Sequence, residues 1–294
     1  MNCRARLPRA EGPVVDRELA LAALTLAIAG PLLFAAGAWR QPSASATGAR
    51  QGEQACWKAL WTPAYPALVG LFTLLGWAAL EPRDAELLPG SILAVSALFA
   101  GIWMRAFTRA VKSAYAQRPQ IVAGTVGLWR PRTVLSHALI AQLDVDALEA
   151  ARAHEAAHVR HRDPLRIWLA QLVTDLQWPW PGPCARFDEW RRVLELARDE
   201  EARCAGIDGA DLAAAILSTV RMTTPSSRTA TLIATRSGLE ERIERLLAPL
   251  HVGEPTRRCS KTTLVVLVSM CVVGAISGLR FGEVAIQMIV STLP

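Results

Sequence analysis

The residues best suited to chemistry are His154-Glu155-Ala156-Ala157-His158, an H-E-x-x-H pattern. On a helix, residues four positions apart share one face, so His154 and His158 can bind one metal ion through their imidazole nitrogens. Glu155, between them, can reach a water molecule beside that ion. The pattern predicts Zn²⁺ bound by the two histidines, with Glu155 as the general base.

The flanking sequence predicts the helix that this motif needs. Asp146 and Glu149 form a D-x-x-E capping pattern, and residues 147–162 are mostly good helix formers without Gly or Pro. Asp163-Pro164 suits the start of a following helix. We therefore expect the motif in the second half of one helix.

A catalytic zinc site keeps three protein ligands, so a third must come from elsewhere in the chain. Residues 164–178 are expected to form a helix that ends in the Trp- and Pro-rich segment 178–183, and residues 185–205 the next helix. On that helix Glu195 and Asp199 share a face that the returning chain can bring to the histidines. Glu195 would be the ligand, and Asp199 would accept the free N–H of a ligand imidazole.

Spacing alone leaves open whether Glu195 and Asp199 reach the metal or are surface carboxylates, as we expect for Glu200 and Glu201. Residues 122–126 and 132–135 have the composition of short strands. A strand edge there could align an extended substrate. No oxyanion donor can be assigned; Tyr115, His137 and His251 are the candidates.

Hydrophobic residues make up 52% of the 294 residues, and the mean hydropathy is +0.24, which excludes a disordered chain or a small disulfide scaffold. The apolar residues gather in four uncharged runs, which we interpret as membrane spans rather than core helices: residues 19–39, 64–80, 88–104 and 263–279. The first run could instead be a signal peptide, because Ala44-Ser45-Ala46 matches a cleavage pattern.

These runs divide the chain into an N-terminal membrane region (1–104), a charged domain (105–262) and a last span with a short tail (263–294). Basic residues flank both ends of the domain, namely Arg105, Arg109 and Lys112, and Arg257, Arg258 and Lys261. The positive-inside rule then predicts a multi-pass protein of the cell (inner) membrane with a cytoplasmic domain. It also explains the net charge of +6 without direct nucleic-acid binding. Three preceding spans would place the N-terminus outside, although the arginines before the first run favour the opposite orientation.

Several segments together resemble the BlaR/MecR-type membrane metallopeptidases, a protease-sensor family. The resemblance covers most of the chain, including three spans before the domain and one after. It rests on the zinc helix followed by Arg162-Asp163-Pro164-Leu165, on Trp178-x-Trp180-Pro181, on Glu195-x-x-x-Asp199, on Leu239-Glu240-Glu241-Arg242-Ile243 and on Gly127-Leu128-Trp129-Arg130-Pro131.

The resemblance implies a mainly α, four-span helical membrane protein with an α+β gluzincin-type zinc metallopeptidase domain between spans three and four. It favours Glu195 as third ligand, with Asp199 and Asp163 supporting the ligands. The implied function is a zinc-dependent endopeptidase of regulated proteolysis, acting on a protein substrate such as a transcriptional repressor. His161 departs from the family pattern, and we expect it to face solvent.

Only residues 280–294 follow the last apolar run, so we expect no penicillin-binding sensor domain there. A signal would then come from a membrane sensor partner, a homo-oligomer or the bilayer. Two alternatives remain: a housekeeping membrane protease of the HtpX type, and a signalling scaffold in which zinc is only structural. The intact Glu155 speaks against the scaffold, because a structural metal site needs no base.

Overall fold

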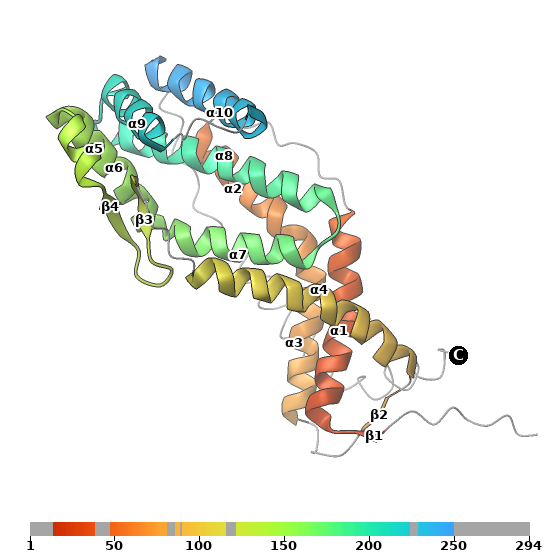
Figure 1. Cartoon of the computed structure of the whole chain (residues 1–294). Helices are drawn as coiled ribbons and strands as arrows, with labels where there is room; N and C mark the ends of the chain where they lie inside the picture. The colour runs from red at the N-terminus through yellow and green to blue at the C-terminus, as the bar shows by residue number, and fades with distance from the viewer. Residues whose placement is uncertain are drawn as a thin grey trace, which may run out of the picture.

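The structure is a computed structural model, and it describes residues 14–38, 48–80, 86–88, 90–115, 122–223 and 229–249. These residues are mostly helical, as the sequence predicts, with two short antiparallel strand pairs (Figure 1). The first part of the chain forms β1 (Val14–Val15), α1 (Arg17–Gly37), α2 (Ala49–Trp61), the 3-10 turn η1 (Thr62–Ala64), α3 (Tyr65–Leu80), β2 (Glu86–Leu87) and α4 (Gly90–Tyr115). Strand β1 pairs with β2.

The second part carries the predicted zinc helix and its neighbours. Its elements are β3 (Ala123–Val126), β4 (Arg132–Leu135), α5 (His137–Gln142), α6 (Val145–His161), α7 (Asp163–Leu176), α8 (Pro181–Cys204), α9 (Gly209–Thr223) and α10 (Thr229–Leu247). The two predicted strands are confirmed and pair as a hairpin. Gly127 follows β3 with a φ of 97°, and a Cβ there would lie 2.5 Å from the carbonyl oxygen of Arg130. Glycine is thus required for this turn.

Two helices among the described residues are long and apolar enough to cross a membrane: Glu18–Gly37 in α1, and α4. Only 39% and 22% of their apolar stretches are buried, so neither is a typical core helix. The expected span 64–80 becomes α3, whose 16 residues rise only about 24 Å, short of the roughly 30 Å of a bilayer core. The expected span 263–279 lies outside the described residues.

Helix α4 continues past the expected end of the third span at Met104 and reaches Tyr115. The basic residues that begin at Arg105 do not stop the helix, because Arg and Lys are good helix formers. Charge marks where a span should leave the bilayer but not where its helix ends. The expected boundary at 104–105 therefore falls inside α4, and the division into 1–104, 105–262 and 263–294 stays a prediction.

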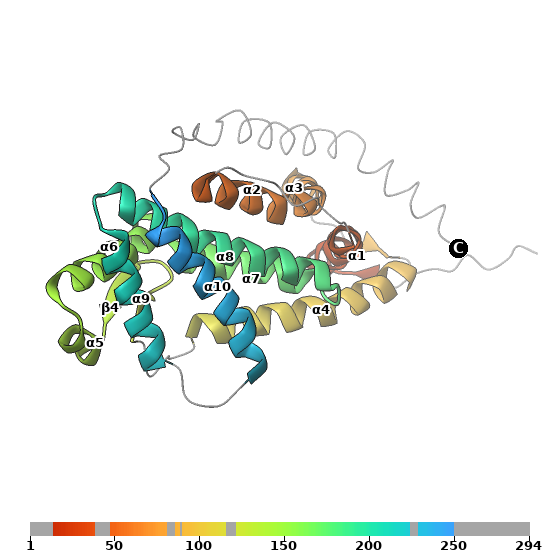
Figure 2. The same ribbon diagram turned by 90° about the horizontal axis from the view of Figure 1, so that it is seen from above.

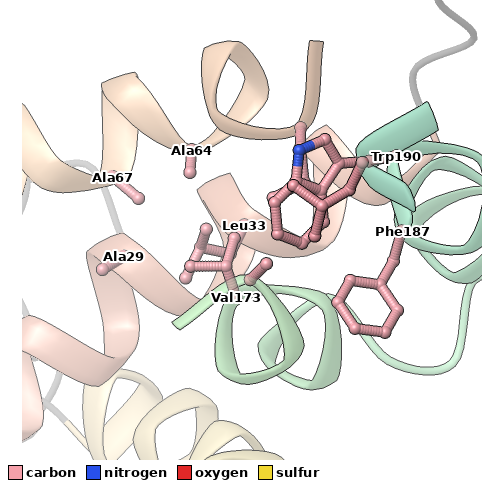
Figure 3. Close-up of a cluster of buried hydrophobic side chains, with 10 residues drawn as sticks. Ala29, Leu33, Ala64, Ala67, Val173, Phe187 and Trp190 are labelled. Carbon is pink, nitrogen blue, oxygen red and sulfur yellow. The ribbon is translucent and has the colours of Figure 1, made fainter. Parts of the chain in front are cut away.

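Helices α7 and α8 form an antiparallel hairpin, with α4 packed on α7 and α2 packed on α8 (Figure 2). One buried apolar cluster joins this hairpin to the N-terminal helices (Figure 3); it consists of Ala29, Leu33, Leu60, Ala64, Ala67, Ala170, Val173, Phe187, Trp190 and Leu194. Composition changes near residue 105, whereas the packing continues across it. The elements that carry the predicted site are held by the expected membrane region.

The tip of the hairpin is anchored on α1. The ring of Trp180 lies 5.3 Å from that of Phe34, centroid to centroid. A Cβ at Gly37 would lie 2.5 Å from the Trp180 ring, so only glycine allows this approach at the end of α1. At the other end, α6 approaches α8 and α9 over a core of small side chains, which includes Ala150, Ala202 and Ala213. Small residues let these helix axes come close, and the site lies between α6 and α8.

Candidate metal centre

Helix α6 presents the two histidines of the motif on its buried face. The cap lies two residues earlier than predicted, because Asp144 rather than Asp146 accepts a hydrogen bond from Ala147 N at 2.8 Å. The helix ends at His161, and the φ of 52° and ψ of 43° of the following Arg162 place that residue in the left-handed region. The motif lies in the second half of the helix, as predicted, and His154 and His158 are both buried.

Glu195 of α8 completes a group of three donors with these histidines, and the ligand atoms lie within 4.8 Å of one another. The two Nε2 atoms are 3.1 Å apart, and the Glu195 carboxylate oxygens lie 3.5 Å from His154 Nε2 and 3.8 Å from His158 Nε2. Zinc bonds of 2.0–2.2 Å at tetrahedral angles place ligand atoms about 3.3–3.6 Å apart. Two imidazoles and one carboxylate at these separations fit a zinc ion.

The sharp turn after α6 brings Asp163 back onto His158. Arg162 occupies the turn, Asp163 starts α7, and its Oδ2 lies 2.9 Å from His158 Nδ1. The guanidinium of Arg198 on α8 donates to both oxygens of Asp163, at 2.6 and 3.0 Å. Burial would raise the pKa of Asp163, but the bonds from His158 and Arg198 hold that pKa well below its usual range. Asp163 is thus an anion that fixes the His158 ring with Nε2 toward the cluster.

A second carboxylate stands behind His154. Asp199 Oδ1 lies 2.9 Å from His154 Nδ1, a close charged contact without the alignment of a straight hydrogen bond. Burial would lower the pKa of His154, but Asp199 and Glu195 outweigh it and raise that pKa to about 9. His154 is therefore protonated at neutral pH in the metal-free protein, and a metal ion would displace this proton on binding.

Arg242 of α10 spans the two carboxylates of α8. It donates to both oxygens of Asp199, at 2.8 and 2.9 Å, and its Nη1 lies 3.2 Å from Glu195 Oε2. Burial would raise the pKa of Glu195, but Arg242 and the histidines lower that pKa well below the usual range. Glu195 is partly exposed, unlike Asp199. The cation of Arg242 keeps both carboxylates ionised in the absence of a metal.

Glu155 is held by the strand that runs beside α6. The hydroxyl of Thr125 on β3 donates to Glu155 Oε2 at 2.9 Å and lies 3.2 Å from the Glu155 carbonyl oxygen. One carboxylate oxygen of Glu155 is thereby fixed, and the other stays available to a water molecule. Burial would lower the pKa of Arg242, but the charges of Glu195, Asp199 and Glu155 raise it, so the Glu155 carboxylate lies near the group that holds Glu195 and Asp199.

Other residues with expected positions lie outside this group. His161 is exposed and its Nε2 contacts Glu201 Oε2 at 2.8 Å, so it faces away from the cluster, as expected. Glu200 and Glu201, which we expect to be surface carboxylates, are only partly exposed, and both have partners. Glu201 pairs with Arg160 at 2.8 Å, and Glu200 accepts from Ala49 N at the start of α2 at 2.9 Å. Helix α2 packs on α8 and needs this cap, which no local sequence signal reveals.

Tyr115 and His137 do not gain support as oxyanion donors. Tyr115 ends α4 and is 82% exposed, and His137 is exposed at the start of α5. His251 lies outside the described residues. The oxyanion donor stays unassigned.

Three residues of the site carry no role in the sequence interpretation: Thr125, Arg198 and Arg242. Arg242 belongs to the Leu239–Ile243 segment that contributes to the family resemblance, but nothing in the sequence pairs it with Asp199. Thr125 and Arg198 lie on elements that the sequence predicts, yet their partners are 30 and 35 residues away. Only an alignment of related chains or the packing itself could have revealed these pairs.

Comparison with known proteins gives one match: the model of Peptidase family M48 matches residues 99–179. This match supports the M48 metallopeptidase family. It includes the H-E-x-x-H helix, Thr125 and Asp163, and it ends before Glu195. No curated protein and no solved structure matches the chain.

The match supports a metallopeptidase and leaves the BlaR/MecR-type resemblance without separate support. Family and geometry agree on one point, because the matched segment contains two of the three residues that could hold a metal ion. The third, Glu195, comes from the packing of α8 on α6.

Proposed function

We propose that the chain is an integral membrane zinc endopeptidase that hydrolyses peptide bonds with Glu155 as general base. The observation that carries this proposal is the convergence of His154, His158 and Glu195 beside Glu155. Peptidase family M48 supplies the enzyme class, and two imidazoles with one carboxylate are a donor set of catalytic zinc sites.

In this proposal each residue of the site has one task. A bound zinc ion supplies a Lewis acid that activates water and polarises the scissile carbonyl. Glu155 takes a proton from the attacking water and delivers it to the leaving amine, since its free carboxylate oxygen can accept and then donate. Asp163 and Asp199 hold the two imidazole rings with their Nε2 atoms converging.

Strand β3 is the element best placed to align a substrate. It pairs with β4 alone among the described strands and contacts α6, and its Thr125 is bonded to Glu155. An extended peptide added along β3 would bring its backbone carbonyls past the general base. Such main-chain pairing would bind peptides with little regard to side chains, so specificity would come from elsewhere.

We further propose a multi-pass protein of the inner membrane whose peptidase elements face the cytoplasm. Helix α2, between the first two expected spans, packs on α8, so this connection lies on the same side as the site. Three spans before the peptidase elements require that arrangement. The two helices that could cross a membrane, α1 and α4, support a membrane protein, and the proposed arrangement needs α3 as the third span.

For the substrate we propose a protein regulator such as a transcriptional repressor, following the BlaR/MecR-type resemblance. The HtpX-type housekeeping protease remains the competing candidate, because the M48 match supports a metallopeptidase and does not distinguish the two kinds. Comparing new protein N-termini in cells with the wild type or with Glu155→Gln separates them. A regulator protease gives few new ends, and a housekeeping protease gives many.

Metal removal tests the proposed activity. We expect the purified full chain in detergent to cleave an unfolded reporter protein, to lose this activity with a zinc chelator, and to regain it when zinc is added back. The reason is that the base alone cannot activate water or polarise a carbonyl to the same extent. Cleavage that survives complete removal of zinc would contradict the proposal.

A further inference from the structure

A buried carboxylate on α2 is connected to the metal centre by a chain of charged contacts. Glu53 is 7% exposed, and its Oε1 accepts from the Nη2 of Arg166 and from Trp190 Nε1, the latter at 3.4 Å. A glutamate is rarely buried without a partner, because the ionised form is poorly solvated in the interior. The partner here is Arg166, which lies in the first turn of α7, three residues after Asp163.

Arg166 bridges two carboxylates on different helices. Its Nη1 donates to Asp163 Oδ1 at 3.1 Å, while Nη2 donates to Glu53. Its guanidinium carbon lies 4.6 Å from the ring centroid of Trp57 and 5.5 Å from that of Trp190. A planar guanidinium between two indoles can present two donors in fixed directions, which a lysine ammonium cannot do.

Asp163 receives the other end of this chain. It faces the guanidiniums of Arg166 and Arg198 and the imidazole of His158. Asp163 therefore contacts two cations, Arg166 and Arg198. The negative charge of Glu53 offsets the positive charge of Arg166. Without the charge on Glu53, the ion pair between Arg166 and Asp163 would become stronger. The hydrogen bond that Asp163 accepts from His158 Nδ1 would then become weaker. The basicity and orientation of the His158 Nε2 would then change.

We infer that Glu53 is a positioning residue of the metal centre, acting through Arg166 and Asp163 on His158. This inference rests on the metal site of the proposed function. It makes the packing of α2, which lies between two expected spans, a part of that site. Glu53 is far outside the segment that matches Peptidase family M48, so the family match gives no reason to assign it.

The test is zinc affinity of the full chain in detergent, measured by competition with a chelating dye. We expect Glu53→Gln, which keeps the volume and removes the charge, to weaken zinc binding about tenfold, the lower end for outer-shell substitutions. The matched control is Glu200→Gln, which removes another carboxylate between α2 and α8 without a bond to the chain of contacts. Its zinc affinity is expected to equal that of the wild type.

A second measurement separates positioning from general destabilisation. Glu53→Gln should alter the visible spectrum of the cobalt-loaded protein, which reports the ligand geometry, and Glu200→Gln should not. Should Glu53→Gln not fold, Arg166→Lys serves instead, because it keeps the charge and loses the two-pronged contact.

Equal zinc affinity and equal cobalt spectra for the wild type and a folded variant of Glu53 or Arg166 would overturn the inference alone. A wild type that binds no zinc would overturn the proposed function, and the inference with it.

In a double-mutant cycle, Glu53→Gln and Arg166→Gln together should weaken zinc binding no more than Arg166→Gln alone. Additive losses would show that Glu53 acts by another route, contrary to the inference.

Discussion

Replacing Glu155 by glutamine is expected to lower kcat by about 10²–10⁴-fold while the zinc content stays that of the wild type. Glutamine cannot take the proton of the attacking water, and general acid–base catalysis contributes effects of this size. Glu155 is not among the three donors of the metal group, so the metal should remain bound. Steady-state cleavage of a reporter protein and metal analysis of the same preparation provide the two readouts.

Thr125→Val gives a graded comparison for this prediction. It removes only the hydroxyl that donates to Glu155, so we expect a loss of about tenfold in kcat, the size of one hydrogen bond. Unchanged cleavage by Glu155→Gln would exclude Glu155 as the base. Loss of zinc from that variant would instead show that the site differs from the proposed arrangement.

Asp163→Asn is expected to cause the largest loss of stability among single substitutions at the site. Asp163 is 1% exposed and is the carboxylate partner of Arg198, whose side chain is 2% exposed. Removing one partner of a buried ion pair leaves an uncompensated charge and costs about 3–5 kcal/mol in the free energy of unfolding. We expect Tm in detergent to fall by roughly 10 °C.

Asp175→Asn is the matched control for this substitution. Asp175 is also buried, but it pairs at 3.1 Å with Arg109, whose side chain is 52% exposed and remains solvated. Loss of such a pair should cost less than about 1 kcal/mol. Equal losses of Tm for the two variants would contradict the view that Asp163 and Arg198 form a buried pair essential to the fold.

Much of the local structure could be predicted from the sequence because its signals are local. Good helix formers after Asp144, and Asp163-Pro164 after the motif, define the ends of α6 and α7 to within a few residues. The Trp- and Pro-rich break before α8 and the two strands of the β3–β4 hairpin were equally visible. Periodicity and capping determine these elements, and neither depends on distant contacts.

The assembly of the site could not be predicted, because it depends on packing between distant segments. Spacing placed Glu195 and Asp199 on one face but left open what that face meets. Helix α2 lacks a long apolar run, so its sequence does not predict that Glu53 is buried against Arg166. Arg242 is ordinary in sequence and is 43 residues from Asp199. Long-range ion pairs carry no local pattern.

The measurement that tests the central claim most directly is the zinc content of the purified full chain beside that of Glu195→Ala. A second variant, Glu189→Ala, removes an exposed carboxylate of the same helix and serves as control. We predict one zinc ion per chain in the wild type and in Glu189→Ala, and loss of most zinc in Glu195→Ala. Equal zinc in all three proteins, or none in the wild type, would contradict a metal centre of His154, His158 and Glu195.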